Sequence, residues 1–143
     1  MNVGRLLLAA IAATIVDAAY GFLVYGTLLH AKFASLPGVY RQDDTAPAYM
    51  PFLFSGTLLA MLAASYIYTK GYEGGSGVKE GNGFGVAIGL FAAGYASIVN
   101  YATLNIDAAL GFTMAGAAFA EWILAGVVIG VVYKPAGAAT AHV

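Results

Sequence analysis

Four long apolar runs, separated by short polar segments, dominate the pattern of this chain. They cover about residues 3–29, 48–69, 83–106 and 108–133. At about 1.5 Å per helical residue, each run is long enough to cross a hydrocarbon core of roughly 30 Å. The start of the first run resembles a signal peptide, but the run continues past Asp17 to full spanning length. The pattern therefore predicts an all-α fold, a polytopic transmembrane four-helix antiparallel bundle.

The polar segments indicate how the helices are joined. Residues 1–135 are predicted to form a single transmembrane domain, and residues 136–143 a flexible tail. The glycine-rich segment 70–82 is typical of a flexible turn. The connection at 105–108 is so short that the last two helices must be antiparallel neighbours, with Asp107 as N-cap of the final helix.

Composition supports a membrane protein and excludes several other classes. Hydrophobic residues make up 61% of the chain and charged residues 9%, whereas about 25% charged is typical of soluble domains. The net charge of −1 provides no basic field to attract nucleic acid. The absence of cysteine excludes disulfides, thiolate metal sites and thiol catalysis. The expected partners are membrane lipid and either other membrane subunits or further copies of this chain.

Two acids interrupt the apolar runs near their centres, Asp17 in the first and Glu121 in the last. Inserting an acidic group at that depth costs about 2.5–3.5 kcal/mol. Protonating a glutamate at pH 7 costs a comparable amount, roughly 3.7 kcal/mol. Because no Lys or Arg lies at midplane depth, we expect a neutral or partly neutral acid, a water-filled site or a partner from another chain. The alternative is that each acid is only hydrogen-bonded within packed helices.

Two further polar residues join the candidate ion or proton site. Tyr20 follows Asp17 by three residues and is placed to donate a hydrogen bond to it. Asn100 is a polar group in the third run that either caps backbone or faces a cavity. The candidate site therefore consists of Asp17, Glu121, Tyr20 and Asn100. The sequence has no paired His, Ser–His arrangement or metal-spaced cluster, so we expect no enzyme, no metal site and no cofactor.

Glycines recur every fourth residue in two of the runs. The third run carries Gly81, Gly85 and Gly89, and the fourth carries Gly126 and Gly130. On a helix this spacing makes a smooth surface on which another backbone packs closely. The two uses of such a surface are packing inside the chain and self-association, and we favour internal packing.

The distribution of Lys and Arg predicts the orientation. The side that holds both termini carries four of them, Arg5, Lys70, Lys79 and Lys134, and the opposite side carries Lys32 and Arg41. This excess predicts that both termini lie in the cytoplasm, in a bacterial inner membrane.

Three segments, YGTLLHAKF, TKGYEGGSG and AGVVIGVVYKP, resemble segments of small, uncharacterised bacterial four-helix integral membrane proteins of unknown function. That resemblance implies a topology and neither a function nor a site. The layout is also similar to that of small multidrug-resistance transporters, which have four helices, an acid in the first helix and a dimeric working form. The chain departs from them in its longer loops, in Asp rather than Glu at position 17, and in Glu121.

Three functions remain open. The favoured one is a structural or accessory subunit of a larger membrane assembly, since the loops are short and the helix faces are rich in Gly and Ala. The alternative is a small proton- or cation-coupled transporter or channel that uses Asp17 and Glu121. The third is a binder of a lipid, quinone or pigment between the helices, which ten tyrosines and eight phenylalanines would allow.

Overall fold

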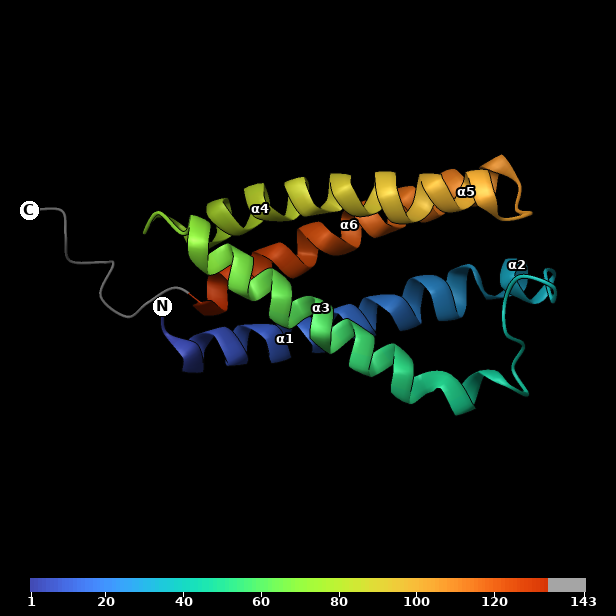
Figure 1. The fold of residues 1–143 in the computed structure, drawn as a ribbon, viewed down its shortest axis with the longest axis horizontal. Helices are drawn as coiled ribbons and strands as arrows, with labels where there is room; N and C mark the ends of the chain where they lie inside the picture. Colours follow the sequence, from blue (N-terminus) through green and yellow to red (C-terminus); the bar gives the residue numbers. More distant parts are fainter. Residues whose placement is uncertain (134–143) are drawn as a thin grey trace, which may run out of the picture.

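The computed structural model describes residues 1–133, which form four long apolar helices packed into one bundle (Figure 1). The described elements, in chain order, are α1 (Val3–Leu23), η1 (Val24–Leu28), α2 (His30–Ala34), η2 (Ala46–Tyr49), α3 (Met50–Gly71), α4 (Gly77–Phe91), η3 (Ala92–Ile98), α5 (Val99–Thr103) and α6 (Ala108–Tyr133). Of these, η1 and η3 are π-helical and η2 is a 3₁₀-helix. Residues 1–133 contain no strand, so the predicted all-α bundle is confirmed.

Several of these elements run into one another and make up the four long helices. The continuous helices are Val3–Leu28, Ala46–Gly71, Gly77–Thr103 and Ala108–Tyr133, and each is long and apolar enough to cross a membrane. They alternate in direction (Figure 1). The N-terminus, the α3–α4 turn and the end of α6 share one end of the bundle, which we name the terminal end. The segment from α2 to η2 and the α5–α6 turn lie at the other, the loop end. The predicted flexible tail, 136–143, lies outside the described residues.

The closest helix pair is α4 and α6, which lie side by side along their length (Figure 1). Four buried glycines of α4 face α6, and we name this contact the glycine seam: Gly77, Gly81, Gly85 and Gly89. Gly77 packs on the backbone of Gly130, and Gly81 on that of Gly126. A Cβ atom added to Gly126 would lie only 2.6 Å from the Cα of Gly85. The two backbones therefore touch, as in close membrane-helix packing.

The seam also explains where one sequence prediction was wrong. The segment 70–82 was expected to be a flexible turn, but α4 begins at Gly77. Glycine is a poor helix former, yet Gly77 and Gly81 gain close contact with α6, which offsets that weakness. The turn itself is held by Glu80, whose carboxylate accepts hydrogen bonds from the backbone N–H groups of Glu73 and Gly75. The loop is thus shorter and more ordered than its composition indicates.

The core lies where α1, α3 and α6 meet. Its largest fully buried apolar side chains are Met61 of α3 and Ile129 of α6. The α1 face contributes three buried alanines, Ala9, Ala10 and Ala13, whose small side chains allow close packing. Towards the loop end α3 diverges from α4 and α6 (Figure 1), and residues 50–56 are exposed. The bundle is therefore tight at the terminal end and open at the loop end.

Candidate functional site

The two acids predicted at midplane depth meet in the structure. Asp17 of α1 and Glu121 of α6 are both half-buried, line the same cavity and lie close enough to interact electrostatically. Two carboxylates this close repel each other, which favours a proton on one of them. Among residues 1–133 no Lys or Arg forms an ion pair with either acid. We name these two residues the acid pair. Because no cation among the described residues is paired with them, one proton shared between the two carboxyl groups relieves their repulsion.

Two tyrosines of the first long helix form hydrogen bonds to α6 at or near the acid pair. The hydroxyl of Tyr25 donates to Oε2 of Glu121 at 3.1 Å. Tyr20 does not donate to Asp17 as expected; its hydroxyl donates to the backbone carbonyl of Ala117 at 2.8 Å. The rings of Tyr20 and Tyr25 meet edge to face, with centroids 6.3 Å apart. Tyr20 therefore ties α1 to α6, while Tyr25 contacts the acid directly.

The sequence offered little indication of Tyr25. It lies eight residues after Asp17, two turns further along the helix, and so is not one of the direct neighbours at three or four residues. In the structure Tyr25 belongs to the π-helical turn η1, where the N–H of Leu29 bonds to the carbonyl of Val24 five residues before it. Such a turn holds an extra residue, changes the direction of nearby side chains, and is frequent at functional sites.

A cavity of about 700 Å³ extends from the acid pair to the loop end. Most of its lining is apolar, including Phe22 of α1 and the α3 residues Leu53 and Phe54. Its polar lining is concentrated at two places, the acid pair at the inner end and the residues of the α2–η2 segment at the outer end. The volume is within the range of about 300–1,000 Å³ typical of ligand sites.

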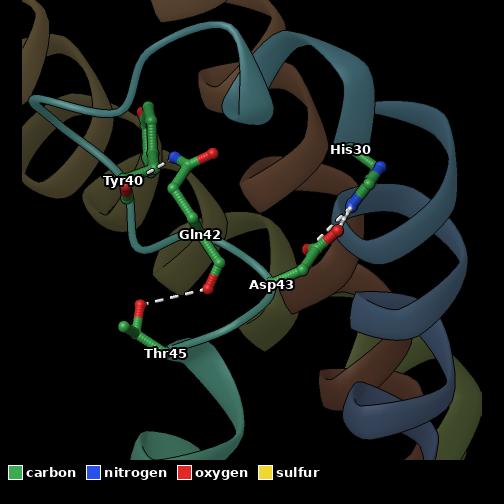
Figure 2. A network of polar contacts seen from close by, with 5 residues as sticks. All are labelled: His30, Tyr40, Gln42, Asp43 and Thr45. Carbon is green, nitrogen blue, oxygen red and sulfur yellow. Dashed lines mark hydrogen bonds and ion pairs between the residues drawn. The ribbon is translucent and has the colours of Figure 1, made fainter.

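The loop between α2 and η2 lines the outer end of the cavity. Polar contacts between its side chains and backbone hold it in place (Figure 2). Nε2 of His30 lies 3.0 Å from Oδ1 of Asp43. The side chain of Gln42 donates from Nε2 to the backbone carbonyl of Tyr40 at 2.9 Å. The backbone carbonyl of Gln42 accepts from the hydroxyl of Thr45 at 3.1 Å. His30, the first residue of α2, therefore anchors this loop to α2.

A second set of contacts ties the loop end to α6. Nζ of Lys32 lies 2.5 Å from Oδ2 of Asp107. Asp107 also caps α6, as its sequence position predicted, because its Oδ1 accepts from the N–H of Leu110 at 2.7 Å. The Lys32 ammonium and the Leu110 N–H together lower the pKa of the Asp107 carboxyl below its ordinary value of 3.8. The Tyr40 hydroxyl contacts Sδ of Met114 at 3.3 Å.

The structure does not gather all the predicted residues. Asn100 lies on α5, is exposed, and is not part of the cavity lining. The glycines predicted for packing lie on the α4–α6 contact, away from the acid pair. Within residues 1–133 no three His, Asp or Glu side chains come together as a metal-ligand group. The candidate site therefore consists of the acid pair, Tyr25 and the cavity that extends from them to the loop end.

Comparisons with protein-family models, with curated proteins and with solved structures give no match for this chain. Function is therefore argued from the site alone.

Proposed function

We propose that this chain is an integral membrane protein that carries protons or small cations across the bilayer, with the acid pair as the exchange site. The observation that supports it is the acid pair itself, two half-buried carboxyl groups at the inner end of a large cavity. Ionisable groups at membrane depth are costly and usually mark ion or proton pathways.

The chemistry of exchange follows from the shared proton. In this proposal, a cation that enters the cavity meets two carboxyl groups that share one proton. Its arrival favours the doubly ionised pair, so the carboxyl O–H bond breaks and the proton leaves to water. When the cation departs, a proton returns, because two unscreened carboxylates in contact repel each other. Tyr25 donates a hydrogen bond that supports the ionised form of Glu121.

Proton flux in liposomes tests this proposal. Purified protein is reconstituted around a pH-sensitive dye, and an imposed potential drives proton entry. We expect flux with the natural protein and none with Asp17→Asn or Glu121→Gln, which keep the shape of the side chains but cannot exchange a proton. Glu73→Gln, at an exposed acid in the α3–α4 turn, is the control and should retain full flux. Equal flux in all four proteins would refute the carrier.

A role as accessory subunit of a larger assembly is the second candidate. Its support is the outer face of the third long helix, where Leu90, Phe91 and Tyr95 are all more than 60% exposed. Either lipid or another membrane subunit would cover this face. The mass of the native particle after gentle extraction decides between them: a large particle with other polypeptides supports the subunit, and a particle of this chain alone supports the carrier.

The apolar lining of the cavity supports a third use, binding of a lipid, quinone or pigment. Extraction of the purified protein with organic solvent, followed by mass spectrometry, tests it. A stoichiometric small molecule that is lost when Phe54→Asp places a charge in the cavity wall would establish this use. We expect no enzymatic activity, because the sequence contains no paired His or Ser–His arrangement.

The proposed orientation places the terminal end in the cytoplasm of a bacterial inner membrane. The natural chain lacks cysteine, so single cysteines are specific reporters. Ser35→Cys at the loop end should react with a membrane-impermeant maleimide added outside intact cells, whereas Ser76→Cys at the terminal end should react only after lysis. The reverse labelling pattern would show that the loop end lies in the cytoplasm. It would not change the proposed role of the acid pair.

A further inference from the structure

A second group of polar side chains lies at the end of α3 and directly after it, at the terminal end of the bundle. Ser65 and Tyr68 are three residues apart on one face of α3, and Tyr72, directly after the helix, brings its ring to 6.0 Å from that of Tyr68. Ser65 is fully buried and Tyr68 is 3% exposed. The hydroxyl oxygens of all three are buried and have no hydrogen-bond partner in the part of the chain that the structure describes. We name these residues the hydroxyl cluster.

Aromatic rings from two other helices enclose the cluster. The ring of Tyr68 meets that of Phe84 at 5.5 Å and that of Tyr133 at 6.0 Å, both edge to face. The Tyr133 hydroxyl accepts a hydrogen bond from the backbone N–H of Asn2 at 3.4 Å. Arg5 and Glu80 lie close enough to act electrostatically on Tyr72. The cluster is therefore a polar patch inside an aromatic wall, with charged groups on its outer side at the terminal end.

Buried hydroxyl groups in proteins are nearly always satisfied, by protein groups or by internal water. A hydroxyl is both a donor and an acceptor, so each of these buried groups offers hydrogen bonds to internal water. Water is the ligand that fits this chemistry, since it can accept from one hydroxyl and donate to the next. The neighbouring charged groups provide a polar entrance from the terminal end.

Along α3 only Met61 separates this cluster from the cavity. Thr57 lines the cavity, Met61 follows one turn later, and Ser65 follows one turn after that. Met61 is 1% exposed and packs in the core with Ile129. Methionine is unbranched and flexible, so it fills such a position and also moves aside more easily than a branched side chain.

We propose that the hydroxyl cluster is a hydration site that connects the acid pair to the terminal end, with Met61 as the barrier between them. This inference rests on the proposed carrier function. It adds a second route out of the acid pair, towards the terminal end. The cavity admits a proton or cation from the loop end, and the cluster releases it at the other. In the release step the carboxyl O–H bond breaks, water in the cluster accepts the proton, and a proton from the cavity restores the pair.

Two readouts test the proposal. The variants are Ser65→Ala and Tyr68→Phe, with Tyr66→Phe as the matched control, because Tyr66 lies on the same helix and is 48% exposed. In the liposome assay we expect proton flux to fall about tenfold in each cluster variant, the effect of one lost hydrogen-bonded link, and to stay unchanged in the control. Unchanged flux in both cluster variants, while Asp17→Asn abolishes it, would overturn the second route and leave the carrier intact.

The melting temperature in detergent tests hydration without any transport. If water satisfies the Tyr68 hydroxyl, Tyr68→Phe loses those bonds and the melting temperature falls, by roughly 2–4 °C. If the hydroxyl is dry and unsatisfied, its removal relieves a penalty and the melting temperature rises, which would overturn the hydration site. If Asp17→Asn and Glu121→Gln leave flux unaltered, the carrier fails, and the melting measurement still decides whether the cluster holds water.

Discussion

The α4–α6 contact and the α1–α3 side of the bundle are built in opposite ways. The glycine seam brings two backbones together with almost no side chain between them. On the other side α3 diverges from its neighbours, and a cavity of about 700 Å³ opens beside the acid pair. Glu121 belongs to the rigid side, because α6 is held by α4, but its side chain faces the open side. The difference indicates that the seam is a fixed support and that any movement belongs to α3 and the loop end.

The largest effect on stability is expected from breaking the seam. Gly126→Ala places a methyl group 2.6 Å from the Cα of Gly85, where only backbone surrounds it. Overpacking of this kind costs roughly 1–3 kcal/mol. Gly116→Ala on the same helix is the control, because a Cβ there meets nothing within 4 Å. Unfolding in detergent, followed by circular dichroism, should show a clear loss for the first and no loss for the second. Equal stability would mean that α4 does not depend on the seam.

A smaller effect is expected from Tyr25→Phe on the open side. It removes the hydrogen bond to Glu121, which contributes about 0.5–1.5 kcal/mol while the acid holds the shared proton. Because this hydroxyl supports the ionised acid, proton flux in liposomes should fall while some activity remains. Full flux would remove Tyr25 from the site and leave the acid pair to act alone.

Tyr20→Phe separates the structural tyrosine from the functional one. It removes the hydrogen bond to the Ala117 carbonyl, which costs about 0.5–1.5 kcal/mol of stability. We expect a modest fall in the free energy of unfolding and no loss of proton flux. Tyr25→Phe, by contrast, is expected to lower the flux. If both variants lost flux equally, the contact between α1 and α6 would matter for transport, and the distinction between the two tyrosines would fail.

The smallest effect is expected at the exposed pair of Lys32 and Asp107. The pKa of Asp107 is lowered in the folded protein, chiefly by Lys32. Its contribution to stability is therefore fully present above the ordinary value of 3.8 and is lost as the pH falls through the lower folded pKa. Asp107→Asn keeps a capping side chain and removes the ion pair. Melting curves should show the natural protein slightly more stable near neutral pH, with the difference shrinking below pH 3.8. A constant difference would exclude the ion pair as its source.

The sequence was informative wherever a property is local. Hydrophobic runs predicted four helices, and glycine spacing predicted which faces pack closely. The capping role of Asp107 followed from its position before an apolar run. The start of α4 was missed because glycine-rich segments usually form turns, whereas here Gly77 and Gly81 are stabilised by α6. Local propensity fails when a distant helix provides the compensating contact.

The residues of the candidate site also fall into those that the sequence indicated and those that only the structure identified. Asp17 and Glu121 were conspicuous in the sequence because each is an acid in a long apolar run. Tyr25 was not conspicuous, since the π-helical turn that orients it has no clear sequence signature. Tyr20 was assigned to the wrong acceptor, because the Ala117 carbonyl belongs to a helix about a hundred positions away in the chain. Asn100 looked like part of the site only because its depth was known and its direction was not.

The sequence by itself determined the class of this protein, its four apolar helices and the acids within them, because hydrophobicity and helical length are properties of each segment alone. Only the tertiary structure decided that Asp17 meets Glu121, that Tyr25 binds the acid, and that the hydroxyls of Ser65, Tyr68 and Tyr72 are buried. Those contacts depend on how each helix is rotated and which helix lies beside it. Rotation and neighbour are set by packing between distant segments, above all by the glycine seam that holds α6 in place.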